Sequence, residues 1–297
     1  MGSTKTVPSR RRRFSSRQVA LAVCLLCFGA APAEAQPRGN RLIPRYITVA
    51  PPDQAEGARI LGEFRQLGLP GDYYLRFNLE VLPRRGERFE VPGELWGSRN
   101  EIGPISRMVI RPAGTAPEER ILVQNGAETR SWSWNGEDAQ PLPVSQALDP
   151  LAGTQATVFD LQMPFVHWTD FVFEGVTRVR GRVAHAFLLY PPEDFAAAHA
   201  DVAGVRIYLD MQFHALMQAV VLDANERPRR TMTVLDLKKV GDQWIVKSID
   251  LRDERTRDKT RFRVTGVALD LDYSPALFEP ESLGETIAAP PRVERIN

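Results

Sequence analysis

The chain has 297 residues, of which 43% are hydrophobic and 25% charged, as in an ordinary globular protein. Its 38 basic and 37 acidic residues nearly balance, so the charge gives no indication of nucleic-acid binding. Both cysteines, Cys24 and Cys27, lie close to the N-terminus.

The first 35 residues predict a secretory signal peptide. Arginines at 10–13 precede an apolar stretch at 19–31, and a small-x-small pattern ends at Ala35, where we expect cleavage. A retained membrane anchor is disfavoured because the apolar stretch is short for a bilayer span of roughly 20 residues. We therefore expect the mature chain, residues 36–297, in the periplasm, with 32 basic and 36 acidic residues.

Cleavage at this point would remove both cysteines. A lipid-attachment signal needs a small residue directly before the cysteine, whereas Val23 and Leu26 occupy those two positions. The mature chain would then have no thiol nucleophile, no disulfide and no lipid anchor.

The mature chain is predicted to open with one helix, followed by strands. A Pro-Pro-Asp sequence that ends at Asp53 predicts the helix start, and apolar residues at helical spacing continue to Leu67. Residues 73–81 then show the cleanest apolar–polar alternation in the chain, which is typical of a strand with one buried face. Asn125-Gly126 is a strong hairpin signal. Further strands are predicted at 87–96, 105–111, 121–123 and 130–134.

Residues 141–154 have no periodicity and predict a loop. Short helices are expected at 159–168 and 193–202, on either side of a hairpin. From residue 205 onwards, short polar turns separate alternating segments, which predicts a run of antiparallel strands. The strands of this half are expected at 172–180, 183–190, 205–210, 215–222, 231–237, 244–251 and 259–269. We predict one mainly β domain over residues 36–283 and a flexible tail over 284–297.

Motifs for catalysis or metal binding are absent from the sequence. It has no phosphate loop, dinucleotide fingerprint, His-Glu-x-x-His helix or Gly-x-Ser-x-Gly elbow. The four histidines fall on different predicted elements: His167, His185, His199 and His214. We expect no enzyme activity, and therefore no catalytic residue, metal or cofactor.

Two charged segments could form either a functional site or a solvated surface. Acids and bases alternate over residues 250–259, and exposed ion pairs, which contribute little individually, are the favoured interpretation. The basic turn at 227–230 could meet an anionic headgroup or a partner, but a solvated turn is the simpler hypothesis.

The predicted strands carry more apolar and aromatic side chains on one face than two or three helices could easily cover. A large antiparallel sheet cannot leave its inner face wet, and curved sheets commonly hold ligands. Part of that face is therefore either a cavity or a core filled by helices and the long loop. The sequence favours neither alternative.

The C-terminal half resembles the outer-membrane lipoprotein-sorting proteins. A strand that ends in Asp210 precedes a hairpin at 227–239, a Trp-Ile-x-Lys strand at 244–247 and a basic turn with Lys259-Thr260. This order is similar to that of the LolA and LolB carriers. The resemblance implies a curved antiparallel sheet forming an incomplete barrel, with a few helices covering the concave face and a hydrophobic cavity that receives acyl chains.

On this resemblance we expect a monomeric, non-catalytic periplasmic carrier that binds the acyl chains of lipids or lipoproteins and takes part in outer-membrane lipoprotein sorting. The sequence does not identify its cargo. The alternative is an envelope sensor or exporter accessory that uses the same fold to bind membrane or exporter proteins, and an envelope hydrolase is a third possibility. The residues predicted to line the cavity are Leu75, Phe77, Leu79, Trp132, Trp134, Phe262 and Val264.

Overall fold

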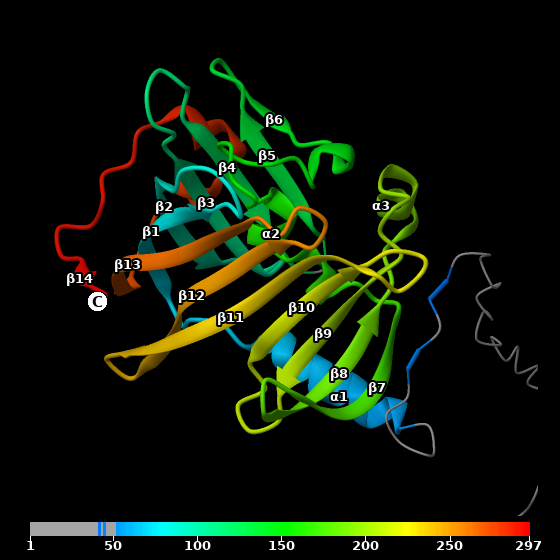
Figure 1. Cartoon of the computed structure of the whole chain (residues 1–297). Helices are drawn as coiled ribbons and strands as arrows, with labels where there is room; N and C mark the ends of the chain where they lie inside the picture. Colours follow the sequence, from blue (N-terminus) through cyan, green and yellow to red (C-terminus); the bar gives the residue numbers. More distant parts are fainter. Residues whose placement is uncertain (1–40, 43, 46–51, 127) are drawn as a thin grey trace, which may run out of the picture. The chain divides into compact units, whose positions relative to one another are not determined.

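Strands from both halves of the chain form one continuous antiparallel sheet (Figure 1). The computed structural model describes residues 41–42, 44–45, 52–126 and 128–297, and within them fourteen strands belong to this sheet. The predicted signal peptide and its cleavage site lie outside the described residues. No helix of the described part is both long and apolar enough to cross a membrane.

The first half of the sheet is a meander in which each strand pairs with the next. Alternating side chains and short turns make this arrangement, as predicted from residue 73 onwards. Its strands are β1 (Asp72–Leu82), β2 (Phe89–Arg99), β3 (Pro104–Ile110), β4 (Glu119–Gln124), β5 (Arg130–Trp134) and β6 (Ala139–Pro141).

The second half is another meander, and its strand β13 pairs with β1, which joins the two halves. Its strands are β7 (Phe171–Val179), β8 (Arg182–Leu189), β9 (Gly204–Asp210), β10 (Leu216–Leu222), β11 (Pro228–Val240), β12 (Gln243–Asp253) and β13 (Lys259–Leu271). The short β14 (Glu294–Arg295) adds to β13. Strands β6 and β7 form the two edges, so the sheet stays open. The prediction of a curved, incomplete antiparallel barrel is confirmed.

Helix α1 (Gln54–Gln66) begins where the sequence predicted it. The Asp53 carboxylate accepts a hydrogen bond from the Ala55 amide at 2.9 Å, which caps the first turn. Gly57 lets the helix approach β7 closely, because a Cβ there would lie 2.4 Å from Cβ of Phe173. The helix therefore packs beside β7 at one end of the sheet, where it buries Ile60 and Leu61 (Figure 1).

The chain between β6 and β7 contains three short helices, and a fourth follows β8. They are η1 (Val144–Gln146), α2 (Val158–Gln162), η2 (Pro164–His167) and α3 (Glu193–Ala198). At the start of α2, Thr157 and Asp160 form a reciprocal capping box. The predicted helix over 159–168 is thus divided in two, because Pro164 cannot continue α2 and Met163 adopts a left-handed conformation (φ 53°).

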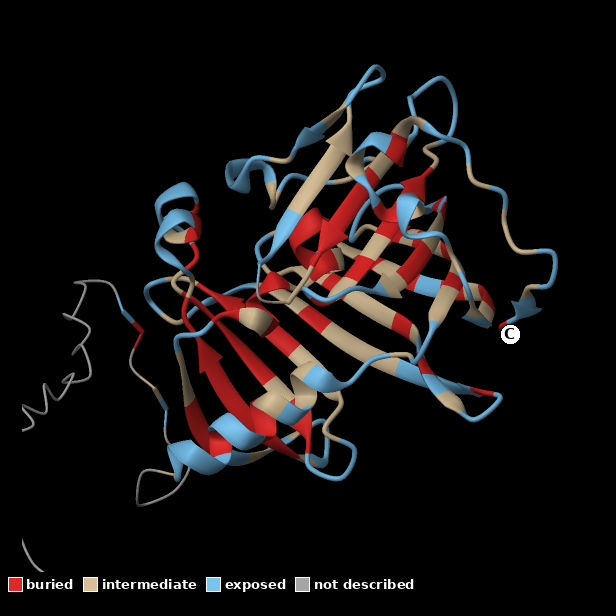
Figure 2. Ribbon diagram, turned by 180° about the vertical axis from the view of Figure 1, so that it is seen from behind, coloured by how far each residue is buried: buried red, intermediate tan, exposed pale blue. Residues whose placement is uncertain are grey.

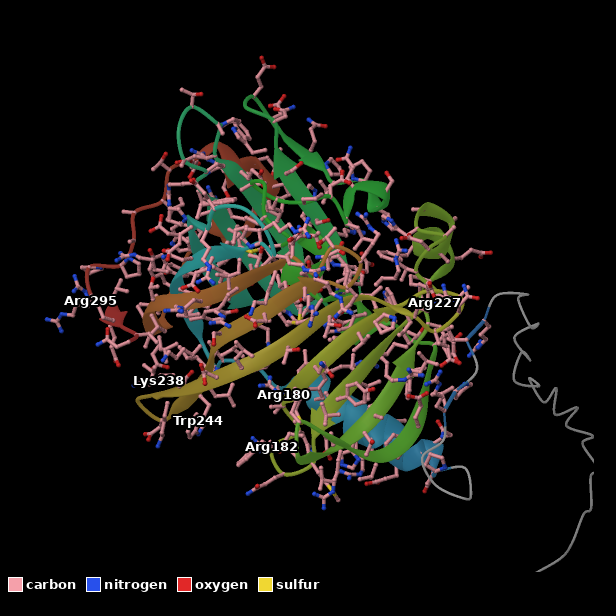
Figure 3. The ribbon with its side chains drawn as sticks, viewed as in Figure 1. Arg180, Arg182, Arg227, Lys238, Trp244 and Arg295 are labelled. Carbon is pink, nitrogen blue, oxygen red and sulfur yellow. The ribbon has the colours of Figure 1, made fainter. Side chains whose placement is uncertain are left out.

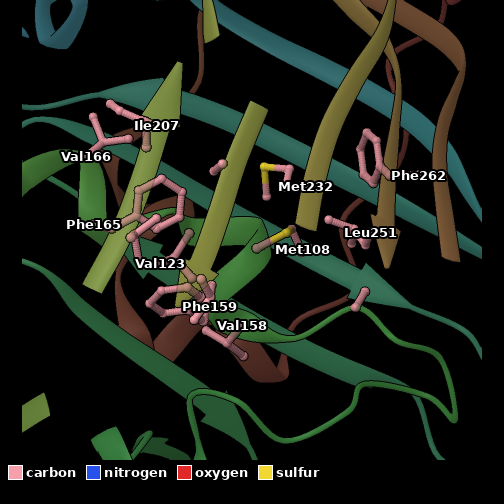
Figure 4. Packing of buried hydrophobic residues seen from close by; sticks show 14 of the residues in the cluster. Met108, Val123, Val158, Phe159, Phe165, Val166, Ile207, Met232, Leu251 and Phe262 are labelled. Atoms are coloured by element: carbon pink, nitrogen blue, oxygen red, sulfur yellow. The ribbon is translucent and has the colours of Figure 1, made fainter. Parts of the chain in front are cut away.

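The main hydrophobic core lies on the concave face of the sheet (Figure 2). Side chains of α2 and η2 face those of strands from both halves there, as Figure 4 shows for Val158, Phe159 and Phe165 opposite Met108 and Met232. The few helices thus cover the concave face, as predicted.

A second, smaller core lies on the convex face of β1–β5. The C-terminal segment covers it through η3 (Pro275–Phe278) and η4 (Pro280–Gly284). The guanidinium of Arg107 is fully buried and donates to the carbonyl oxygens of Ser282 at 2.7 Å and Glu285 at 2.6 Å. At the end of the chain, β14 pairs with β13 and Ile296 is buried.

Candidate functional site

The concave apolar face is the candidate site, and four of the predicted cavity residues meet at its centre. Phe77 of β1 stacks on Phe262 of β13 with ring centroids 4.6 Å apart. Leu79 is opposite Phe262 and Phe77 is opposite Val264 in the β1–β13 register. Phe77, Leu79 and Val264 are fully buried, and Leu75 packs against the same cluster while partly exposed.

Trp132 and Trp134, also predicted for the cavity, pack on the other face. Trp132 is opposite Leu122 in the β4–β5 register, and Leu122 belongs to the convex core. The ring of Trp134 leaves no room for a Cβ on Gly284, which would lie 2.6 Å from it. The structure therefore divides the predicted set between the two faces of the sheet.

One segment, residues 142–170, covers the concave face, and we call it the connector. It runs from edge strand β6 to edge strand β7 and includes η1, α2 and η2 (Figure 1). Phe159 lies at the centre of an aromatic cluster, with ring centroids 5.4 Å from Phe165, 5.2 Å from Phe195 and 6.2 Å from Trp168. The connector thus fills much of the concave face with its own side chains.

Polar contacts tie the connector to β11 and β13 near α2. Arg230 of β11 forms an ion pair with Asp160 and donates to the carbonyl oxygen of Gln155 at 2.5 Å. The hydroxyl of Thr260 in β13 accepts a hydrogen bond from the Gln155 amide at 2.8 Å. Arg230 belongs to the basic turn expected to be solvated, but its side chain is only 16% exposed. No pattern in the sequence indicates this role.

Further polar contacts hold the other parts of the connector. Arg65 of α1 donates to the carbonyl oxygens of Val166 and Trp168, each at 2.7 Å. The side-chain amide nitrogen of Gln162 donates to the main-chain carbonyl oxygen of Gln124 at 3.0 Å, at the end of β4. A ring nitrogen of His199 lies 2.7 Å from the Val144 carbonyl oxygen.

His167 lies at the end of η2, where the connector meets α1. Burial and, to a smaller extent, the neighbouring Arg65 and Arg99 guanidinium groups together lower the pKa of its imidazole to about 4. The histidine is therefore neutral at physiological pH. A neutral side chain suits its position between two cations.

A cavity of about 570 Å³ opens at the edge of the concave face, between β4, β5 and the connector. Its volume falls within the range of about 300–1,000 Å³ that is typical of small-molecule sites. Its apolar lining residues on the concave side are Ile121, Leu142, Leu151 and Val158. The concave face is thus largely filled, with open space beside the connector.

Glu119 is the buried acid at this cavity. One of its carboxylate oxygens accepts a hydrogen bond from the Ala152 amide at 2.7 Å, and the other is buried without a hydrogen-bond partner among the described residues. Burial raises the pKa of Glu119, which the Ala152 hydrogen bond opposes. The polar residues Glu118, Arg120, Ser133 and Asn135 also line the cavity.

A second cavity, of about 370 Å³, is polar and lies on the convex side, where Thr233 and Asp250 face away from the core. Lys259 and Arg261 pair with Asp250 at 2.8 and 2.7 Å. Burial alone would raise the pKa of Asp250, but these two hydrogen-bonded cations lower it. This ion-pair cluster stabilises the sheet surface and offers no unpaired acid at its centre.

Side chains that could bind a metal ion do not gather in the part of the chain that the structure describes. No group of three or more His, Cys, Asp or Glu side chains there could hold a metal ion. His185 and His214 approach each other, with ring centroids 6.1 Å apart, whereas His167 belongs to the connector and His199 contacts it at Val144.

Comparison with known proteins agrees with this description. The model of a family described as an uncharacterized protein matches residues 115–285, more than half of the chain. No curated protein matches the chain.

Three solved structures share the fold. A putative outer-membrane lipoprotein-sorting domain from Vibrio parahaemolyticus has a TM-score of 0.67 at 14% identity, covering 78% of this chain and 100% of that one. A DUF1329 family protein from Desulfovibrio piger has a TM-score of 0.65 at 15% identity, covering 77% and 98%. A LolA superfamily protein from Nitrosomonas europaea has a TM-score of 0.58 at 13% identity, covering 75% and 96%.

Identities this low establish the fold alone. They confirm the LolA-like fold that the resemblance in the sequence implied. The chain therefore belongs to the family of uncharacterized proteins whose model matches residues 115–285, and it has a LolA-like fold.

Proposed function

We propose that the protein is a non-catalytic periplasmic carrier that binds acyl chains of lipids or lipoproteins between the sheet and the connector. The observation that carries the proposal is the way in which the concave face of the sheet is covered. The connector covers much of it together with side chains of α1 and α3, several polar contacts hold the connector to the sheet, and a mainly apolar cavity of about 570 Å³ opens beside it. The proposed location rests on the predicted signal peptide.

The energetics suit a carrier. Burial of each methylene group contributes about 0.8 kcal/mol, so ten methylenes of one acyl chain contribute about 8 kcal/mol. A chain longer than the cavity would displace side chains of the connector, such as Leu151 and Val158, from the concave face. That displacement costs part of the binding energy, which keeps the affinity low enough for release.

The fold also suits the cargo named for a relative. The Vibrio parahaemolyticus structure is described as a lipoprotein-sorting domain, and it shares the open sheet. Lipoproteins carry acyl chains, so the cargo class proposed here fits both that description and the apolar cavity.

Two matched variants test the proposal. Leu151 lines the cavity, whereas Leu148, on the same connector and also half-buried, does not. We expect Leu151→Glu to weaken the binding of a fluorescent fatty-acid probe at least tenfold, because it places a charge in the apolar cavity. Leu148→Glu should leave the affinity within about twofold of wild type. Equal affinities in wild type and Leu151→Glu, with both proteins folded, would contradict an acyl site in this cavity.

A further inference from the structure

Exposed apolar side chains gather at one end of the second meander. Six of the ten large exposed hydrophobic residues in the described ranges lie in three turns or in the strand ends that flank them: Val176, Met211, Phe213, Leu237, Trp244 and Val246. The turns are 176–182 between β7 and β8, 210–214 between β9 and β10, and 237–247 between β11 and β12. Every second turn of an antiparallel meander falls at the same end, so the three are neighbours. We call them the apolar-basic rim.

The hairpin between β11 and β12 turns an apolar face outwards. Its register pairs Leu237 with Val246 and Lys239 with Trp244, and these pairs point away from the core. Ile245, next to Trp244, is instead buried in the main core. Trp244 is 63% exposed, although a tryptophan on a stable strand normally packs against a neighbour. Figure 3 shows Lys238 and Trp244 on this hairpin.

The two neighbouring turns continue this surface. Arg180 of the β7–β8 turn and Leu235 of β11 line the same polar convex cavity. The guanidinium of Arg182 lies 5.8 Å from the ring centroid of Phe213, which is 60% exposed. Figure 3 shows Arg180 and Arg182 at the same end of the sheet as Lys238.

Cations outnumber acids on the rim. It carries six basic residues: Arg178, Arg180, Arg182, Lys238, Lys239 and Lys247. Its two acids are Asp210, which pairs with Arg182 at 2.8 Å, and Asp242, which lies 3.5 Å from Lys239. The other four cations form no ion pair with any described acid. The rim therefore carries a net positive charge, with Lys239 on the same face of the hairpin as Trp244 and Lys238 on the other face.

We propose that the apolar-basic rim docks the protein on the surface of a bilayer that contains anionic phospholipid. Each Lys or Arg near such a surface strengthens binding, and an exposed tryptophan suits the interface between headgroups and acyl chains. A protein partner fits less well, because lysine is depleted at protein–protein interfaces and three of the six cations are lysines. The inference does not depend on the cargo of the concave face.

Vesicle binding by the mature chain tests the rim. We expect it to co-sediment with vesicles of phosphatidylcholine and phosphatidylglycerol at low salt, and much less with phosphatidylcholine alone or at high salt. Lys238→Gln and Lys247→Gln should each weaken binding about fivefold, which corresponds to about 1 kcal/mol per cation. Trp244→Ala should weaken binding further. It should also abolish the blue shift of tryptophan fluorescence that we expect when vesicles are added to the wild-type protein.

Matched controls lie at the opposite end of the sheet. Arg85 is an exposed cation in the β1–β2 turn, and Phe89 is 45% exposed beside it. Arg85→Gln and Phe89→Ala should leave vesicle binding unchanged. The proposal is overturned if the mature chain does not bind anionic vesicles, or if rim and control variants bind them alike. Loss of a protein partner on mutation of the rim, with no vesicle binding by wild type, would also overturn it.

Discussion

Asp160 of the connector and Arg230 of β11 form an ion pair that is almost removed from water, with side chains only 6% and 16% exposed. The Thr157 hydroxyl donates a second hydrogen bond to the same carboxylate oxygen of Asp160 at 2.8 Å. The pair therefore joins the first turn of α2 to the sheet across 70 residues of sequence. It is the contact through which the connector and the second meander are most directly coupled.

Breaking this pair should loosen the connector. Arg230→Met leaves Asp160 buried without its cation, so we expect a loss of about 3 kcal/mol in the free energy of unfolding. Asp160→Asn should also destabilise the protein, and the double variant should lose less than the sum of the two. Urea unfolding of all four proteins measures this coupling. Strictly additive losses would show that the two side chains do not act as a pair.

Phe77 tests whether the centre of the concave face is dry. Phe77 is fully buried against Phe262, so an unpaired carboxylate in Phe77→Glu should cost several kcal/mol and unfold the domain. Asn78, the next residue, lies on the other face and donates to Glu90 at 2.6 Å. Asn78→Ala should cost about 1 kcal/mol or less. Thermal unfolding followed by circular dichroism distinguishes them, and a folded Phe77→Glu would mean that water reaches this face.

Acidification should destabilise the protein through His167. The pKa of its imidazole is about 4 in the folded state and about 6.5 in the unfolded chain, so the unfolded state binds the proton first. Stability from this group is complete above pH 6.5 and is lost as the pH falls towards 4. We expect a loss on the order of 2 kcal/mol over that interval. His167→Gln should flatten this part of the stability–pH profile, and an unchanged slope would assign it to other groups.

The strands were predictable from the sequence because their side chains alternate. Residues 73–81 gave β1 within one residue at each end, and the turns after them gave the meander order. Alternation, however, does not reveal whether the apolar side chains of a strand lie on the concave or the convex face of the sheet. Trp132 and Trp134 share one face as predicted, but the pairing of Leu122 with Trp132 turns that face outwards.

The role of the connector was not predictable in the same way. Its loop and short helix were expected, but their placement depends on contacts between residues far apart in sequence, such as Gln155 with Thr260. No local pattern records such contacts. The exposure of Trp244 could not be predicted from the sequence either. Trp244 and Ile245 alternate with the period of any strand, and the register alone decides which of the two points inwards.

The most direct test of the carrier is native mass spectrometry of the mature protein extracted from the periplasm. We expect one protein chain with added mass that corresponds to an acyl-bearing lipid or lipoprotein, and loss of that mass in Leu151→Glu but not in Leu148→Glu. A ligand-free protein, or a stable complex with another protein that carries no lipid, would contradict it.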